Sequence, residues 1–174
     1  MGAVRTIMYR LNETADAGEL ESLLGQVQEF DDVDLSVSGN AQTLRSGRRV
    51  IARWVKNSSG TTLNPGEVCT WSSGFAGIRV GGVTGSAGTG VGAVSPFVSS
   101  VADGKHFWLI QEGPGTARSG ASLSANAIII PTSTGEVVTV TNDAAGSLSA
   151  CGRAITAAGA ADVTINVFWK FPGY

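Results

Sequence analysis

Hydrophobic and polar positions follow two different periods along this chain. Between residues 17 and 30 the large apolar side chains recur at three- and four-residue intervals, which would place them on one face of a helix. These side chains are Leu20, Leu23, Leu24, Val27 and Phe30. Asp16 is suited to the N-cap, and Glu19 three residues later would complete a capping box. The pattern therefore predicts one amphipathic helix of about four turns over residues 17–30.

Past residue 48 the pattern changes to short apolar runs broken by glycine, proline, asparagine and serine, which is typical of many short strands. We expect strands within residues 48–57, 67–71, 77–82, 104–113, 126–132, 135–142 and 162–171. In the last of these runs every second residue from Val163 to Phe171 is apolar. The chain is therefore predicted to be mainly β, a small antiparallel sandwich or barrel with an N-terminal arm carrying one amphipathic helix.

Charge divides the chain near the same place. Residues 1–44 contain eight acidic and two basic side chains, whereas residues 45–174 contain six acidic and ten basic ones. The second part opens on a basic run that includes Arg45, Arg48 and Arg49. We expect residues 1–48 to form the arm and residues 49–174 the β-rich domain. Pairing between the acidic segment and the basic run, within one chain or between neighbours, is the simplest interpretation of these charges.

The overall composition argues against two classes of partner. A net charge of −2 and a pI near 5.3 are unlike the basic domains that bind nucleic acid. The first residues, MGAVRTIMYRLNET, contain two arginines and no long apolar run, so they fit neither a signal peptide nor a membrane anchor. We expect neither nucleic acid nor a membrane as a partner.

Candidate chemistry is sparse. His106, the one histidine, lies in an expected strand between hydrophobic residues, which we expect to end at the turn residues Gly113 and Pro114. No serine lies in a G-x-S-x-G elbow that could pair with this histidine. The sequence therefore indicates a structural histidine and predicts no catalytic residue and no enzymatic activity.

Other motifs also fall short of a cofactor or metal site. The G-x-G-x-G run at Gly88, Gly90 and Gly92 has neither the spacing of a dinucleotide site nor the lysine of a P-loop, so we interpret it as a loop between strands. The acidic run over residues 29–40 lacks the spacing of a calcium loop. Cys69 and Cys151 show no metal-ligand spacing and are interpreted as small buried residues, with a disulfide left open. No cofactor and no metal are predicted.

Several short turn and strand motifs stand out in the later part of the chain. The motifs cover roughly residues 49–174. They are Val55-Lys56-Asn57, Pro65-Gly66 before Val68, Asp103-Gly104 with Trp108 leading to Gly113-Pro114, and Gly152-Arg153-Ala154. In these motifs the chain resembles the head decoration, or capsid cement, proteins of tailed bacteriophages. The resemblance implies a small β-rich protein without enzymatic activity that binds the outer surface of the assembled capsid in the virion. Its implied partners are the major capsid protein and other copies of the same chain.

Within that resemblance, the unusual N-terminal part is the candidate anchor to the capsid or to a neighbouring copy. The predicted contact residues are Leu20, Leu23, Leu24, Val27, Phe30, Arg45, Arg48 and Arg49. The alternative is that the helix only covers an open end of its own β-domain. A tail-fibre or receptor-binding module would share this composition, and aromatic residues could then stack on sugars. The candidates for such stacking are Trp54, Trp71, Trp108 and Trp169.

Overall fold

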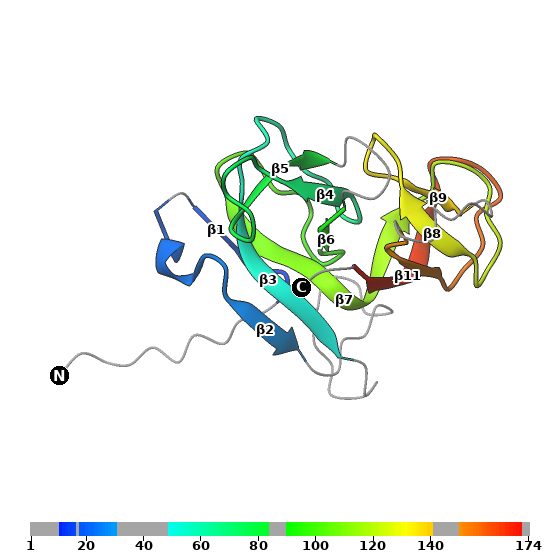
Figure 1. Cartoon of the computed structure of the whole chain (residues 1–174), viewed down its shortest axis with the longest axis horizontal. Coiled ribbons are helices and arrows are strands. Elements are labelled where there is room, and N and C mark those ends of the chain that lie inside the picture. The colour runs from blue at the N-terminus through cyan, green and yellow to red at the C-terminus, as the bar shows by residue number, and fades with distance from the viewer. Residues whose placement is uncertain (1–10, 17, 31–48, 84–89, 141–149, 172–174) are drawn as a thin grey trace.

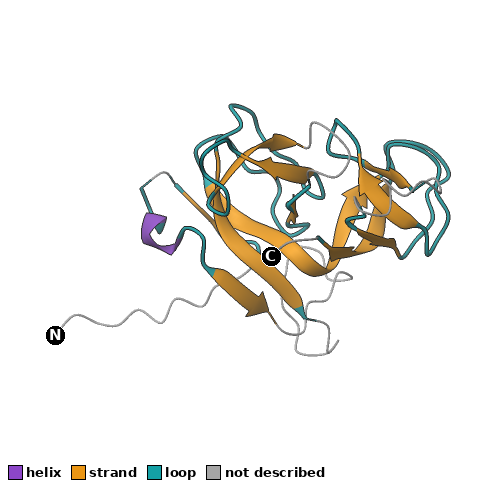
Figure 2. Ribbon diagram, in the orientation of Figure 1, coloured by secondary structure: helices purple, strands orange, loops and turns teal. Residues whose placement is uncertain are grey.

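The computed structural model describes residues 11–16, 18–30, 49–83, 90–140 and 150–171, and it is a mainly β structure built on one eleven-stranded sheet (Figure 1). The strands are β1 (Thr14–Ala15), β2 (Val27–Phe30), β3 (Val50–Asn57), β4 (Val68–Trp71), β5 (Arg79–Val83), β6 (Gly92–Val94), β7 (His106–Arg118), β8 (Ile128–Pro131), β9 (Val137–Thr139), β10 (Gly152–Ala154) and β11 (Thr164–Lys170). Within these ranges the one helical element is the short 3-10 turn η1 (Glu21–Leu23), purple in Figure 2.

The prediction of a mainly β fold is confirmed, and each of the seven expected strand regions contains a strand. The sheet is mixed rather than purely antiparallel, because β3 and β5 run parallel at Lys56 and Asn57. In β11 the alternation predicted from the sequence holds, since Ile165, Val167 and Trp169 are buried while the residues between them are exposed. The strands β1, β2, β6 and β10 were not predicted.

The strand β7 does not end at the glycine-proline pair, so that expectation is wrong. It continues through Gly113, Pro114 and Gly115, because β11 pairs with it over the whole run from Glu112 to Arg118. Gly113 has a φ of 112°, a conformation open to glycine. A Cβ on Gly115 would lie 2.5 Å from the Trp169 indole nitrogen, so this position has no room for a side chain. The two glycines therefore allow close packing within a continuous strand.

The thirteen-residue length of β7 lets it belong to two similar β-units. The first unit, residues 50–112, contains β3 to β6 and the first half of β7. The second unit, residues 112–170, contains the second half of β7 and β8 to β11. The antiparallel ladders β3–β7, β4–β5, β4–β6 and β6–β7 of the first unit have the counterparts β7–β11, β8–β9, β8–β10 and β10–β11 in the second. In Figure 1 β7 crosses from the strands around β3 to those around β8.

Hydrogen bonds outside the ladders repeat in the same places. The bridge that joins Leu63 to Val101 in the first unit has its counterpart between Leu123 and Ala158 in the second. The amide of Asn57 donates to Lys105 O at 2.8 Å, and the amide of Ser119 donates to Val163 O at 2.9 Å. Such agreement over turns as well as strands identifies the two units as an internal structural repeat.

The sequences of the two units hardly reveal this repeat. The ladder pair Trp54–Trp108 in the first unit corresponds to the pair Thr116–Asn166 in the second, counted from the matching strand ends. Among the matching positions, Leu63 with Leu123 and Gly92 with Gly152 keep their residue type. The repeat was therefore not predicted from the sequence.

Each unit has an inner core on one face of its strands. In the first unit this core is lined by Val55, Leu63, Cys69, Val94, Val101, Phe107 and Leu109. The matching positions in the second unit are buried as well, and they are Ala117, Leu123, Ile129, Ala154, Ala158, Ile165 and Val167. The side chains that alternate with these residues form an outer face on each unit, and the two outer faces differ.

Candidate interaction surface

The helix predicted over residues 17–30 is absent, and this expectation is wrong. Gly18, Leu20 and Gly25 have φ angles of 89°, 52° and 85°, which a right-handed helix cannot contain. Half of the predicted capping box exists, because Glu19 Oε2 accepts a hydrogen bond from the amide of Asp16 at 3.3 Å. The chain then makes the short turn η1 and enters β2, which pairs with β3. Four of the five apolar side chains still pack against the core, but Val27 is exposed and the backbone is not helical.

The described N-terminal segment, residues 11–16 and 18–30, covers the outer face of the first unit. Phe30 is buried and meets Trp108 edge-on, with 5.1 Å between the ring centroids. Leu11 and Ala15 are buried in the same cluster, which also holds Trp54 and Ile110 of the outer face. This arrangement resembles the alternative in which the segment covers its own domain. How the chain divides at residue 48 stays a prediction, since residues 31–48 lie outside the described part.

Three ion pairs fasten this segment to the first unit. Lys105 Nζ contacts Asp16 Oδ1. Lys56 Nζ lies 3.9 Å from Glu21 Oε1. The third pair joins Arg49 Nη1 to Glu29 Oε1 at 3.5 Å, as the predicted pairing of the acidic segment with the basic run requires within one chain. The segment is thus an apolar strip with carboxylates at its margins, held against a face whose margins are basic.

The predicted contact residues do not share one exposed surface. Leu20, Leu23 and Leu24 are partly buried against the core, and Phe30 is a core residue with 1% of its surface exposed. Val27 is 45% exposed. Arg49 is exposed beside Glu29, while Arg45 and Arg48 lie outside the described residues. Whether any of these residues contacts a partner stays a prediction.

His106 is fully buried on the outer face of the first unit. Its ring lies parallel to that of Trp54 with 6.2 Å between centroids, and Nδ1 is 3.2 Å from the backbone oxygen of Asp16. This geometry agrees with the predicted structural role, because the ring connects β7 to the N-terminal segment.

The two cysteines are free and buried, in agreement with their interpretation as small apolar residues. Burial raises the pKa of the Cys151 thiol to about 12. Burial, together with the nearby Glu67 carboxylate, also raises the pKa of Cys69. Both thiols therefore stay protonated and unreactive at neutral pH.

Two glycines of the G-x-G-x-G run and three of the four tryptophans proposed for sugar stacking are buried. Gly90 and Gly92 are buried against Val68 and Leu109, and Gly88 lies outside the described residues. Three of the tryptophans proposed for stacking on sugars are 0–1% exposed, so their rings cannot meet a glycan. They are Trp54, Trp108 and Trp169, which leaves the half-buried Trp71.

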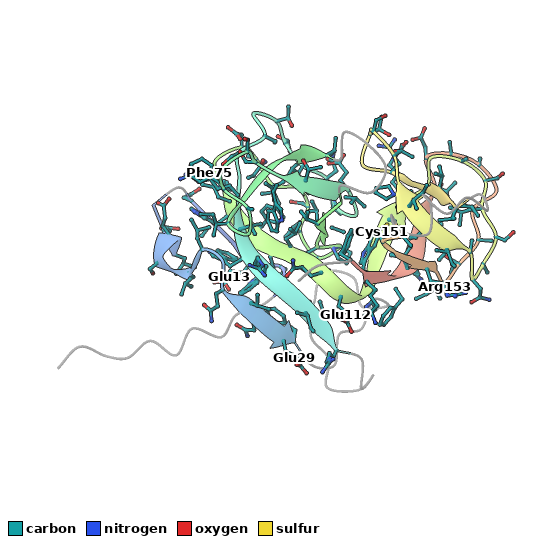
Figure 3. The ribbon with its side chains drawn as sticks, viewed as in Figure 1. Glu13, Glu29, Phe75, Glu112, Cys151 and Arg153 are labelled. Carbon is teal, nitrogen blue, oxygen red and sulfur yellow. The ribbon has the colours of Figure 1, made fainter. Side chains whose placement is uncertain are left out.

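The outer face of the second unit is exposed and apolar. The ladder places Ile128, Arg153 and Phe168 side by side across β8, β10 and β11. The amide of Ile155 donates to Asn166 O, which puts this residue at the end of the same face. Ile128, Ile155 and Phe168 are 42–44% exposed. We call these four residues, Ile128, Arg153, Ile155 and Phe168, the second outer face, and Figure 3 labels Arg153 at its centre.

The first unit shows how unusual this exposure is. Val68, Ala93 and Ile110 occupy the matching ladder positions on its outer face, and all three are fully buried. Val68 lies with Phe171 and Pro131 around Gly90, and residues 11–16 and 18–30 cover the neighbouring part of that face around Trp108, whereas no described segment lies over the second outer face. Within the described ranges there is also no group of His, Cys, Asp and Glu residues suited to a metal ion, and no helix long and apolar enough to span a membrane.

Comparison with solved structures shows a fold similar to that of a phage protein. No protein-family model and no curated protein matches the chain. Among solved structures, the chain is similar to the N base of head fiber gp8.5 in bacteriophage phi29, with a TM-score of 0.51 and 10% sequence identity. The match covers 70% of this chain and 94% of that one. At this identity the similarity shows a shared fold, and the protein that shares it is a component of a phage head.

Proposed function

We propose that this chain is a phage head decoration protein that binds the outer surface of the assembled capsid and stabilises it by bridging capsid subunits. The observation that carries this proposal is the fold shared with the base of a phage head fiber over nearly all of that chain. The motif resemblance to capsid cement proteins supports the same conclusion from the sequence. The proposed partners are the major capsid protein and other copies of the chain.

The proposed mechanism is mass action and requires no catalysis. A protein that binds the assembled shell better than free shell subunits shifts the equilibrium toward the closed particle. Many identical sites on one shell let modest contacts add together when each copy touches more than one subunit. The buried His106 and the protonated thiols fit this passive role.

The test is a comparison of phage particles with and without the protein. Mass spectrometry of purified virions should detect the chain in many copies, and an antibody to it should bind intact particles. Shells that carry the protein should disassemble at a higher temperature than shells without it. Absence from the virion, or shells of equal thermal stability, would refute the proposal.

A further inference from the structure

The internal repeat makes the second outer face unusual. In the first unit the part of the outer face around Trp54 and Trp108 is covered by the N-terminal segment, whose sequence over residues 11–30 contains five carboxylates and no basic residue. Three of these carboxylates pair with bases that belong to the first unit or adjoin it. The first unit therefore shows what one such outer face contacts, namely an apolar segment whose carboxylates pair with neighbouring basic residues.

The second outer face also combines apolar and basic side chains, but no described segment lies over it. Its apolar part is made by Ile128, Ile155 and Phe168. Its basic part is made by Arg153, at the centre of the row, while Lys170, two residues beyond Phe168, lies directly opposite Glu112 in the ladder. Among the described residues no carboxylate lies within ion-pair distance of Arg153, although one of its nitrogens donates to Asn126 O at 2.7 Å.

We propose that the second outer face is the surface with which this chain docks on the shell, onto an apolar patch of the capsid protein that carries at least one carboxylate opposite Arg153. This inference rests on the proposed function. An isologous contact with a second copy would bring two Arg153 side chains together in apolar surroundings, which is costly without counter-charges. An acidic, apolar partner satisfies both parts of the face, as residues 11–30 do in the first unit.

The experiment measures binding of the full chain to capsids assembled without it, using two changes on the face and two matched controls. Phe168→Thr removes an exposed aromatic ring from a strand position that suits threonine. Phe75→Thr is its control, because Phe75 is 40% exposed at the opposite end of the molecule (Figure 3). Arg153→Gln removes the exposed positive charge of the face, and Lys105→Gln, which removes a charge whose side chain is 42% exposed in the first unit, is its control. Circular dichroism and thermal melting verify that every variant is folded.

We expect Phe168→Thr to weaken shell binding at least about tenfold and Arg153→Gln about three- to tenfold, as central interface residues do. Both controls should stay within about twofold of the original chain. Unchanged binding by Phe168→Thr and Arg153→Gln, with the original chain bound, would overturn the inference and leave the proposed function standing.

Two further outcomes are decisive. If Phe168→Thr dissociates an oligomer of the free protein while shell binding is kept, the occupant of the face is a second copy and the inference is wrong. If the original chain itself does not bind shells, the proposed function and this inference fail together.

Discussion

The two β-units have the same ladders and turns but opposite outer faces. The first unit packs Trp108 against Phe30 of the N-terminal segment and buries Trp54 and Ile110 in the same cluster. The second unit leaves Ile128 and Phe168 open to solvent at the matching face. In both units the inner core stabilises the strands, so the outer face is free to pack against another segment of the chain or against a partner protein.

The largest expected effect comes from weakening the contact between the N-terminal segment and the first unit. Phe30→Ala should lower the free energy of unfolding by about 3 kcal/mol or more, since a buried ring that packs against Trp108 is lost. Denaturant unfolding followed by tryptophan fluorescence measures this loss. A loss below about 1 kcal/mol would mean that the segment does not stabilise the first unit.

A pair of matched substitutions compares the two outer faces directly. Ile110 and Phe168 occupy the same ladder position, but Ile110 is fully buried and Phe168 is 44% exposed. Ile110→Ala should cost about 2–4 kcal/mol of folding stability, whereas Phe168→Ala should cost less than about 1 kcal/mol. Equal losses in urea unfolding would show that the second outer face is as buried as the first.

The rates at which the two buried thiols are chemically labelled measure how readily each unit unfolds locally. Cys69 lies in the first unit and Cys151 immediately before β10 in the second, and labelling of either requires local opening because both are buried. In single-cysteine variants we expect Cys151 to react about tenfold faster than Cys69 under native conditions, a difference of about 1.4 kcal/mol in opening free energy. Faster labelling of Cys69 would contradict the view that the uncovered unit is the weaker one.

The smallest expected effect concerns the ion pair between Arg49 and Glu29 at the edge of the N-terminal segment. Arg49→Gln removes the ion pair with Glu29, in which both side chains are about half exposed. We expect a loss of about 0.5 kcal/mol at low salt that disappears near 1 M salt, where exposed pairs are screened. A loss that persists in high salt would indicate that Arg49 stabilises the cover by packing rather than by charge.

The limits of sequence reasoning are clearest at the N-terminal segment. Leu20, Leu23 and Phe30 do pack toward the core, as their spacing indicates, yet the left-handed conformations at Gly18, Leu20 and Gly25 make the segment a turn followed by a strand. Glycine permits such conformations but does not require them. The strand β2 forms because β3 offers it a free edge, and that edge exists only in the assembled sheet.

The candidate surface was likewise beyond the reach of the sequence. Ile128, Ile155 and Phe168 are spread over 40 residues and belong to short apolar runs that look like any half-buried strand. Only the ladder that joins β8, β10 and β11 brings the first and last of them to either side of Arg153. The sequence did not reveal the matching unit either, since few residue types are kept between the two.

The sequence by itself determined the β character, the seven predicted strand regions, the structural role of His106 and the buried state of both cysteines. These properties follow from local alternation and residue chemistry, which neighbours along the chain already express. Tertiary structure alone decided that β7 joins two units, that residues 11–30 cover the first, and that the second outer face is exposed. Those outcomes depend on contacts between residues far apart in the chain, and no local pattern specifies which distant strands will pair.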